Sequence, residues 1–569
     1  MSSILPKIIT RPFPKPAFEA LLNQDVHPVL ARVYAARGIK DPLQLQNILS
    51  ALIPVDRLKN AEQMARILAD AIAAKKRLLI IADYDADGAT ACAVGIRALR
   101  EFGAVVDYIV PNRFEYGYGL TPEIVQLAAR TKRPDILITV DNGIAAVEGV
   151  AEANRLGMAT LVTDHHLPGD ELPQAACIVN PNQHGCGFSS KNLAGVGVMF
   201  YVMLALRAEL RARHAFDGAA EPNLSRLLDL VALGTVADVV KLDDNNRILV
   251  GQGLKRMREG KANAGIQALF RAAGRDPLRA STYDLAFMLG PRLNAAGRLD
   301  DMSLGIECLI SDDAAFADSA ARKLDQLNRE RRDIEAGMKE TALAELERIE
   351  ARDSVSLCLF DPEWHPGVVG LLASRIKEKF HRPVIAFAPA GNDEIKGSGR
   401  AIPGLHLRDA LDLVAKRHPG LILKFGGHAA AAGLSIRRND FENFSAAFEE
   451  ITAALVSPAD LEHVIETDGA LAIGDMQIEL ARLLENEVWG QGFPQPSFSS
   501  DFAVENQRVV GEKHLKLKLS LPGSTFDAML FFQSTPLPQR ILAVYRLAVN
   551  EYRGAQSLQL NIEHWQPSA

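Results

Sequence analysis

The chain lacks the paired cysteines that zinc modules and disulfide frameworks need. Its cysteines are odd in number and widely spaced, and no Cys-x-x-Cys motif occurs (Cys92, Cys177, Cys186, Cys308 and Cys358). Because such modules depend on closely spaced pairs, this pattern argues against them. We expect reduced thiols and a cytoplasmic location.

Long apolar runs are absent as well. A membrane-spanning helix needs about 20 predominantly apolar residues, and the segment from Met1 to Pro16 also lacks the apolar stretch of a secretory signal. We therefore expect no membrane partner. The chain has no internal repeat and no G-x-x-x-x-G-K-[ST] motif, so nothing in it suggests ATP-driven motion.

An excess of positive charge is the third absence. The net charge is −7, so a polyanion would have to be bound by a local basic channel and not by the overall field. At 569 residues, with 48% hydrophobic and 23% charged residues, the chain has ordinary globular composition and is too long for one core. Three or four domains are expected.

The most informative stretch runs from Leu78 to Thr90. Four apolar residues precede three aspartates at alternate positions, Asp83, Asp85 and Asp87, and Gly88 follows. This pattern predicts a buried parallel strand that leads into a helix. Three like charges at one strand end repel one another unless a cation lies between them. A divalent metal site is the simplest explanation.

Two alternatives exist for this stretch. D-x-D-x-D-G matches the first half of an EF-hand loop, but position twelve of such a loop would be Val94 instead of Glu, and a strand stands where the entering helix should be. The other alternative is an ordinary acidic surface turn. It is excluded only if the rest of the chain supplies further metal ligands.

Further strand ends carry similar groups. From residue 77 the pattern predicts strands at 78–82, 105–110, 136–140 and 160–163, with helices at 89–102, from 121 onward, and at 145–156. This is a parallel sheet covered by helices, in which ligands bind beyond the carboxyl ends of the strands. Asp141 follows the third strand, and Asp164, His165 and His166 follow the fourth. We interpret this sheet edge as an active site.

Two later segments could contribute. Asp238 ends an apolar helical pattern, and an unpaired buried carboxylate is costly. Its side chain is therefore either paired, through helix capping or with Lys241, or it is a metal ligand. The segment 290–298 places Arg292, Asn294 and Arg298 among glycines, which suits phosphate contacts.

A long helix over about 313–350 is predicted to connect this unit to a second α/β unit beginning near Val355. That unit contains two glycine-rich segments with cations, 396–400 and 424–429, which favour oligoanion binding. From about residue 460 short alternating strands predict a small β-barrel or sandwich. Lys513, Lys516 and Lys518 suit single-strand binding by an OB-type barrel or are simply a solvated face.

Together, the aspartates, the Asp164-His165-His166 triplet and Asp238 closely resemble the motifs of the DHH phosphoesterase superfamily, and Phe425-Gly426-Gly427-His428 resembles its DHHA1 domain. Chain length, the segments 290–298 and 397–400, and the β-rich tail resemble the bacterial branch of single-strand-specific 5′→3′ DNA exonucleases. The resemblance covers roughly residues 45–569. It implies a nuclease of DNA repair and recombination that releases 5′-mononucleotides.

The resemblance also implies residue roles. Two divalent cations would be held by the metal ligands Asp83, Asp85, Asp87, Asp141, His165 and Asp238. Asp141 would bridge the ions, Asp164 would orient a histidine, and His166 would contact the scissile phosphate. A mixed carboxylate and imidazole set suits Mn²⁺ better than Mg²⁺, although Mg²⁺ stays an alternative. Substrate contacts would come from Arg113, Arg292, Asn294, Arg298, Ser398, Arg400, Gly426, Gly427 and His428, with Arg113, Ser398 and Arg400 around the 5′ phosphate.

The expected partners are single-stranded DNA, a single-strand-binding protein and a helicase. The alternatives are a nanoRNase or nucleotide phosphatase of the same superfamily, a manganese pyrophosphatase, or a non-catalytic nucleic-acid scaffold. The expected fold is an α/β DHH domain with a parallel sheet, a connecting helix, a second α/β domain and a C-terminal OB-like barrel. The expected boundaries are an N-terminal extension at 1–75, then 76–310, 311–352, 353–456 and 457–569.

Overall fold

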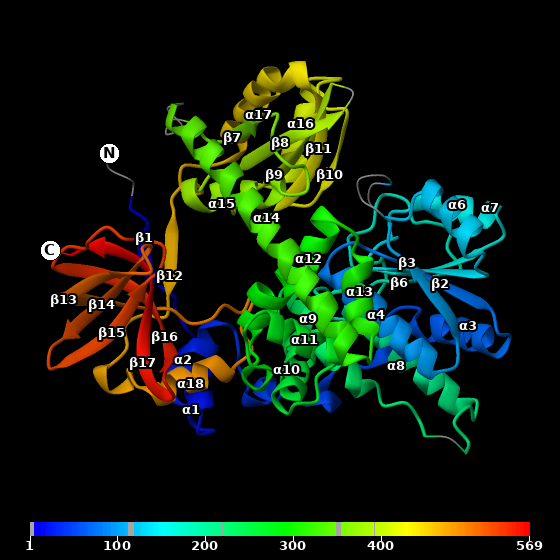
Figure 1. Ribbon diagram of the computed structural model, residues 1–569, viewed down its shortest axis with the longest axis horizontal. Helices are drawn as coiled ribbons and strands as arrows, with labels where there is room; N and C mark the ends of the chain where they lie inside the picture. Colours follow the sequence, from blue (N-terminus) through cyan, green and yellow to red (C-terminus); the bar gives the residue numbers. More distant parts are fainter. Residues whose placement is uncertain are drawn as a thin grey trace. The chain divides into compact units, whose positions relative to one another are not determined.

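The computed structural model describes residues 5–111, 116, 119–218, 220–348, 354–391 and 393–568. It divides into two compact units (Figure 1). The larger unit comprises residues 10–328 and 467–569, and the smaller unit comprises residues 1–9 and 329–466. No helix in the described part of the chain is long and apolar enough to span a membrane.

A parallel five-stranded sheet organises the first part of the larger unit. Its strand order is β3-β2-β4-β5-β6, with bounds β2 (Arg77–Ala82), β3 (Val105–Ile109), β4 (Ile136–Val140), β5 (Ala159–Thr163) and β6 (Cys177–Val179). The predicted strands and the parallel arrangement are confirmed. The apolar runs are buried on both faces, as expected for a sheet covered by helices.

Helices cover both faces of this sheet (Figure 1). On one face α6 (Pro122–Thr131) and α7 (Val147–Arg155) bury Leu79, Ile81 and Leu137. On the other face Leu78, Ile80 and Ile138 join the main core with α3 (Ala61–Ala73), α4 (Ala86–Glu101) and α8 (Gly195–Ala212). Thr121 caps α6 by accepting a hydrogen bond from the Ile124 amide, and Pro122 occupies its first turn.

Helix α4 begins three residues earlier than its predicted start at Ala89. The Asp85 side chain accepts hydrogen bonds from the amides of Asp87 and Gly88, so Asp85 is the N-cap. Asp87 therefore lies in the first turn of the helix, where a carboxylate is favoured by the helix dipole. Capping by an aspartate inside the motif explains the earlier start.

The larger unit contains further helices, of which α18 packs against the barrel strands described below. They are α1 (Lys15–Leu22), α2 (Pro28–Ala36), α9 (Leu228–Ala237), α10 (Asp244–Arg258), α11 (Ala264–Ala272), the π-helix η6 (Asp284–Leu289), α12 (Gly290–Leu299), α13 (Ser303–Ile310) and α18 (Ile478–Asn486). Short 3₁₀ turns are η1 (Pro42–Leu45), η2 (Leu49–Ala51), η3 (Val55–Arg57), η4 (Leu224–Leu227), η5 (Pro277–Arg279) and η8 (Ile473–Asp475). The long helix α14 (Ala314–Arg348) begins in this unit and continues into the other.

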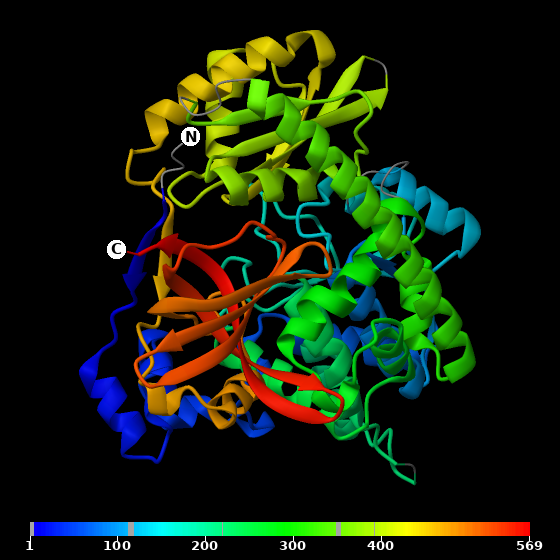
Figure 2. The same ribbon diagram turned by 60° about the vertical axis from the view of Figure 1, so that its left-hand side comes forward.

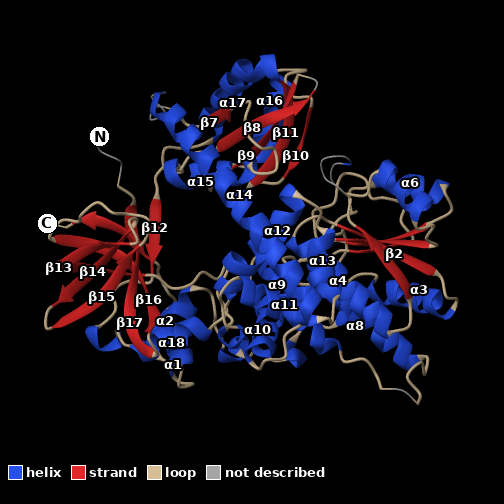
Figure 3. Cartoon of the chain, viewed as in Figure 1, coloured by secondary structure: helices blue, strands red, loops and turns tan. Residues whose placement is uncertain are grey.

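A closed barrel of five strands forms the C-terminal part of the larger unit (Figures 2 and 3). The order β13-β14-β15-β17-β16 comprises β13 (Phe498–Val510), β14 (His514–Leu521), β15 (Ser524–Leu530), β16 (Arg540–Tyr552) and β17 (Ala555–Pro567). Along β14, Leu515, Leu517 and Leu519 are buried, while Lys516 and Lys518 alternate with them. The OB-like barrel predicted from this alternation is confirmed.

The N-terminal segment joins the barrel side of this unit to its helical part. Arg37, which follows α2, binds the buried carboxylate of Asp468 through Nη1 and Nη2 at 2.7 and 3.0 Å. Tyr34 of α2 stacks on Trp489 and Phe493, with centroid distances of 5.8 and 6.2 Å. The sequence alone offered no specific role for this segment.

The smaller unit is built on a mixed sheet with the order β10-β11-β9-β8-β7. Its strands are β7 (Leu357–Phe360), β8 (Val384–Gly391), β9 (Glu394–Arg400), β10 (Lys424–Gly427) and β11 (Ala431–Arg437), and its helices are α15 (Val369–Phe380), α16 (Leu407–Arg417), η7 (Arg438–Asp440) and α17 (Phe441–Leu455). Strand β1 (Lys7–Thr10) pairs with β12 (Val464–Thr467). The glycine-rich segments, for which we expected oligoanion binding, lie mostly in strands β9 and β10. Gly397 is suited to β9 because an added Cβ would lie 2.5 Å from the Phe387 ring.

Candidate metal centre

The carboxyl ends of the central strands are in register. Ala82 pairs with Val140, Val140 with Thr163, and Thr163 with Val179. Since each of these is the last residue of its strand, the residues that follow form a row along the sheet edge: Asp83, Asp141, Asp164 and Asn180. Parallel pairing thus brings together groups that are far apart in the sequence.

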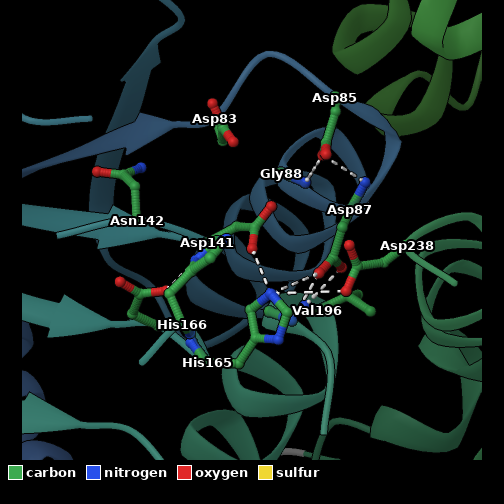
Figure 4. A network of polar contacts seen from close by, with 12 residues as sticks. Asp83, Asp85, Asp87, Gly88, Asp141, Asn142, His165, His166, Val196 and Asp238 are labelled. Atoms are coloured by element: carbon green, nitrogen blue, oxygen red, sulfur yellow. Dashed lines mark hydrogen bonds and ion pairs between the residues drawn. The ribbon is translucent and has the colours of Figure 1, made fainter. Parts of the chain in front are cut away.

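The imidazole of His165 faces three carboxylates (Figure 4). Its Nε2 lies 3.0 Å from Asp141 Oδ1, 3.5 Å from Asp238 Oδ2 and 3.9 Å from Asp87 Oδ2. Asp238, the C-cap of α9, enters the site from the helical part of the unit. No lysine lies within 4.0 Å of Asp238 among the described residues, so Lys241 does not pair with it.

Asp87 is held by a second helix. Its two oxygens accept hydrogen bonds from the amides of Gly195 and Val196, at 2.6 and 2.8 Å, in the first turn of α8. Gly195 also allows close approach to the site, because an added Cβ would lie 2.7 Å from the Asp141 side chain. The first turn of α8 therefore contacts both Asp87 and Asp141.

Burial and mutual repulsion shift the carboxyl pKa values upward. Burial raises the pKa of Asp87 to about 7, with a further contribution from the charge of Asp85. Burial, followed by the charge of Asp87, raises the pKa of Asp141 and of Asp238 well above the ordinary range. A site that gathers buried carboxylates in this way is suited to bind cations.

The donor atoms fit a metal ion. Asp141 Oδ1 and Asp238 Oδ2 are buried oxygens that accept no hydrogen bond in the described part of the structure. Leaving such oxygens without a donor is costly in a folded protein. They lie beside an imidazole nitrogen, and carboxylate oxygen with imidazole nitrogen is a donor set that divalent transition metals accept. The residues therefore fit a divalent cation.

The possible ligands fall into overlapping sets. Within each set, one ligand atom per residue lies within 4.8 Å of the others: Asp83, Asp85 and Asp141; Asp87, His165 and Asp238; and Asp141, His165 and His166. The first two sets share no residue. All of the residues predicted as metal ligands are therefore brought together, and their roles stay predictions.

Asp164 orients the second histidine of the triplet. Its Oδ1 lies 2.7 Å from His166 Nδ1 and also accepts the His165 amide, while Oδ2 accepts the Ile144 amide. Burial would raise the pKa of Asp164, but the hydrogen bond from His166 and the charges of both histidines lower it. Burial lowers the pKa of His166, yet the hydrogen bond to Asp164 and the charge of that carboxylate outweigh burial and raise the pKa to about 9.

Three asparagines support the site and were not singled out from the sequence. Asn142 donates to the carbonyls of Ile81 and Val140 and so ties two strand ends together. Asn180 donates to the His166 carbonyl and Asn182 to the His165 carbonyl, at 2.9 and 2.6 Å. Asn180 and Asn182 follow the apolar strand β6. The strand-end pattern that revealed the other residues was a signal for them as well.

The predicted substrate contacts lie in several places. Arg292 and Asn294 lie on α12 and have protein partners on other helices: the Arg292 guanidinium pairs with Asp325 of α14, and Asn294 Oδ1 accepts the Ala86 amide of α4. Arg298 lies in the last turn of α12. Arg113 lies outside the described residues.

In the smaller unit, Ser398 and Arg400 are side by side on β9. Arg400 Nη1 donates to Ser398 Oγ at 3.1 Å, and both side chains lie 2.9 Å from where a Cβ of Gly370 would be, in the first turn of α15. Ser398 is opposite Gly433 on β11, which is opposite Gly426 on β10. Gly427 ends β10 and His428 follows it, with its side chain exposed.

Three family models match the chain in order. The DHH family N-terminal domain matches residues 77–235, the DHHA1 domain matches residues 353–454, and the RecJ OB domain matches residues 467–564. Thus the sheet with its carboxylate cluster, the smaller unit and the barrel each match a separate family model.

Several relatives match over nearly the whole chain. The single-stranded-DNA-specific exonuclease RecJ of Dickeya dadantii is 49% identical over 98% of this chain and 100% of its own length. The protein of the same name from Escherichia coli is 48% identical over 96% of this chain and 97% of its own length.

Solved structures agree with these relatives. The crystal structure of RecJ from Thermus thermophilus in complex with Mn²⁺ matches with a TM-score of 0.81 and 30% identity, over 99% of this chain and 80% of that one. A second structure of RecJ from this organism was solved in complex with Mg²⁺. With near-full-length relatives at almost one-half identity and all three domains matched in order, the chain belongs to the RecJ family of single-stranded-DNA-specific exonucleases.

Proposed function

We propose that this chain is a metal-dependent exonuclease that degrades single-stranded DNA 5′→3′ to 5′-mononucleotides in DNA repair and recombination. The observation that carries the proposal is the buried cluster of Asp87, Asp141, His165 and Asp238 in a chain of the RecJ family. Substitution of Asp87, Asp141 or Asp238 should abolish metal binding while the protein stays folded.

The proposed centre holds two divalent cations, with Mn²⁺ preferred and Mg²⁺ as the alternative. Two ligand sets that share no residue support two positions, and Asp141 belongs to one set while it lies 3.0 Å from His165 of the other. Asp141 is therefore the proposed bridge. The imidazole nitrogen favours Mn²⁺ because the preferred Mg²⁺ shell is made of oxygen.

When bound, a pair of divalent ions can activate a water molecule and stabilise the leaving oxygen of a phosphodiester. The chain's own residues hold the reacting groups in place. Asp164 holds the His166 ring in place through Nδ1. We assign His166 Nε2 to the scissile phosphate.

The smaller unit is proposed to bind the 5′ phosphate through Ser398 and Arg400. Both side chains gather at the first turn of α15, where backbone amides and the helix dipole favour an anion. Beside Ser398, Gly433 and Gly426 form a strip of backbone without side chains, and a Cβ built on Gly426 would meet no atom within 4 Å. A strand could lie closely on this strip, with His428 at its end.

The barrel is proposed to bind the same single strand. Arg508 lies directly opposite Lys516 in the β13–β14 pair, and like charges in this position repel each other. Neither has a carboxylate within 4.0 Å in the described structure, so a phosphate backbone would relieve the repulsion. Phe532 is 85% exposed and Phe531 is 44% exposed, and both rings lie next to His514. Exposed aromatic rings of this kind allow nucleic-acid bases to stack on them.

A single-strand-binding protein and a helicase are the proposed partners, since an enzyme that acts on single strands needs unwound DNA. The cytoplasm is the proposed location, in keeping with five free cysteines, which a reducing compartment maintains.

The test uses the full-length protein with Mn²⁺ and a long single strand labelled at its 3′ end, with and without a 5′ phosphate. We expect progressive shortening from the 5′ end, release of mononucleotides, and faster degradation of the phosphorylated strand. A duplex of the same sequence should persist. Cleavage restricted to oligomers of a few nucleotides would favour the nanoRNase alternative, and no cleavage with any divalent metal would favour a scaffold.

A further inference from the structure

We propose that helix α12 is a positioning element that sets the geometry of the Asp83–Asp87 loop, and that Asn294 and Gly297 are its positioning residues. This inference rests on the proposed metal centre and adds a role for a segment that the sequence associated only with phosphate contacts. Neither residue belongs to the ligand sets of the cluster.

The first contact is a hydrogen bond to the loop backbone. Asn294 Oδ1 accepts the amide of Ala86 at 2.8 Å. Ala86 lies between Asp85, which caps α4, and Asp87, which faces His165. Fixing the peptide between two candidate ligands fixes the direction in which both carboxylates leave the backbone.

The second contact is a close approach that only glycine permits. A Cβ built on Gly297 would lie 1.8 Å from the carbonyl oxygen of Tyr84, well inside any tolerated separation. Tyr84 lies between Asp83 and Asp85. Helix α12 therefore touches the loop at two successive points, a peptide carbonyl and a peptide amide, on either side of Asp85.

A third contact holds α12 itself. The guanidinium of Arg292 pairs with Asp325 of α14 through Nε at 3.0 Å and Nη2 at 2.8 Å, and both side chains are at least nine-tenths buried. Both nitrogens contact the same oxygen, Asp325 Oδ1, and this buried, charge-assisted pair restrains the position of the helix. Arg292, Asn294 and Gly297 thus form a connected path from α14 to the aspartate loop.

The consequence is a specific division of roles. A group that positions ligands should influence cation affinity even in the absence of DNA, whereas a phosphate contact should influence only DNA affinity. Supporting groups behind metal ligands typically change metal affinity 10–100-fold when removed. Because Asn294 acts through the backbone, we expect an effect near the lower end of this range.

The experiment measures Mn²⁺ binding to the full-length protein without DNA, by electron paramagnetic resonance of free Mn²⁺. We expect Asn294→Ala to raise the Mn²⁺ Kd ~10-fold and Asn294→Asp, which retains an acceptor for the Ala86 amide, to keep the affinity at or above wild type. Gly297→Ala should weaken Mn²⁺ binding as well, since the loop must move away from the new Cβ.

The matched control is Asn154→Ala on α7, which also removes one hydrogen bond between an asparagine side chain and the backbone, here donated to the Gln174 carbonyl at 3.0 Å. This variant should bind Mn²⁺ as the wild type does. Unchanged Mn²⁺ affinity in Asn294→Ala would overturn the inference, as would a failure of Asn294→Asp to restore it. If the wild-type chain binds no Mn²⁺, the proposed metal centre falls, and this inference with it.

Discussion

Asp141 is buried, adopts a left-handed backbone with φ 62°, and has an oxygen that accepts no hydrogen bond from the described residues. Val239, directly after Asp238, has φ 63°, which is strained for a β-branched residue. Such conformations cost free energy and persist where the surrounding structure requires them, often at functional sites. At the residue scale, the arrangement of the cluster favours ligand binding and lowers the free energy of unfolding when no ligand is bound.

This imbalance gives a prediction for Asp141→Asn. We expect activity on single strands to fall by more than ~100-fold, beyond the usual effect of a supporting residue, while the Tm without metal stays equal or rises because one buried like charge is removed. Added Mn²⁺ should raise the Tm of the wild type but not of this variant. The measurements are nuclease assays and thermal unfolding in EDTA and in Mn²⁺.

Asp135→Asn is the matched control, because Asp135 precedes the same strand β4 at its opposite, exposed end. Its activity and its response to Mn²⁺ should equal those of the wild type. Full activity of Asp141→Asn on long strands would refute the proposed role of this carboxylate.

At the element scale, the barrel face around Arg508 and Lys516 differs from a plain solvated surface because its opposed cations lack acidic partners in the described structure. We expect Lys516→Gln to weaken binding of single-stranded DNA. It should also reduce the slope of log Kobs against log salt by about 0.7, the value for one lost phosphate contact on a single strand. Binding titrations at several salt concentrations measure both effects.

Lys76→Gln serves as the comparison, since Lys76 is exposed at the amino end of β2, opposite the metal cluster. An identical salt slope in Lys516→Gln and wild type would mean that the lysines of β14 are only a solvated face.

At the scale of the whole molecule, the barrel and the metal-binding sheet belong to one compact unit although residues 329–466 separate them in the chain. Arg37 and Asp468 form a buried ion pair across this separation, with Trp489 below the Arg37 guanidinium. We expect Arg37→Ala to destabilise the larger unit by about 3 kcal/mol, because the buried Asp468 carboxylate keeps only the Ser497 amide at 3.2 Å and the longer contact to Arg11 among the described residues.

Chemical unfolding measures this change, and limited proteolysis should release the barrel more readily from the variant. Arg77→Ala provides the control, since its ion pair with Asp135 is exposed on both sides and contributes less than about 1 kcal/mol. Equal losses of stability in the two variants would contradict the bridging role of the N-terminal segment.

The local pattern of the sequence was sufficient for much of the fold. The strand predicted at 136–140 agrees with the structure residue for residue, since an apolar run depends only on near neighbours. The start of α4 differed because Asp85, a candidate ligand, also caps the helix. The strands formed by the glycine-rich segments were not predicted, because neighbouring strands supply pairing that glycine itself does not favour.

By itself, the sequence determined which residue types carry chemistry and that they follow strand ends, because strand periodicity and charge are local properties. Only the tertiary structure decided how they combine. The register of four strand ends aligns Asp83, Asp141 and Asp164, and the packing of α9 brings in Asp238. Similarly, the contact of Asn294 with Ala86 joins residues 208 positions apart. Long-range pairing of this kind depends on the packing of whole elements, which no local pattern encodes.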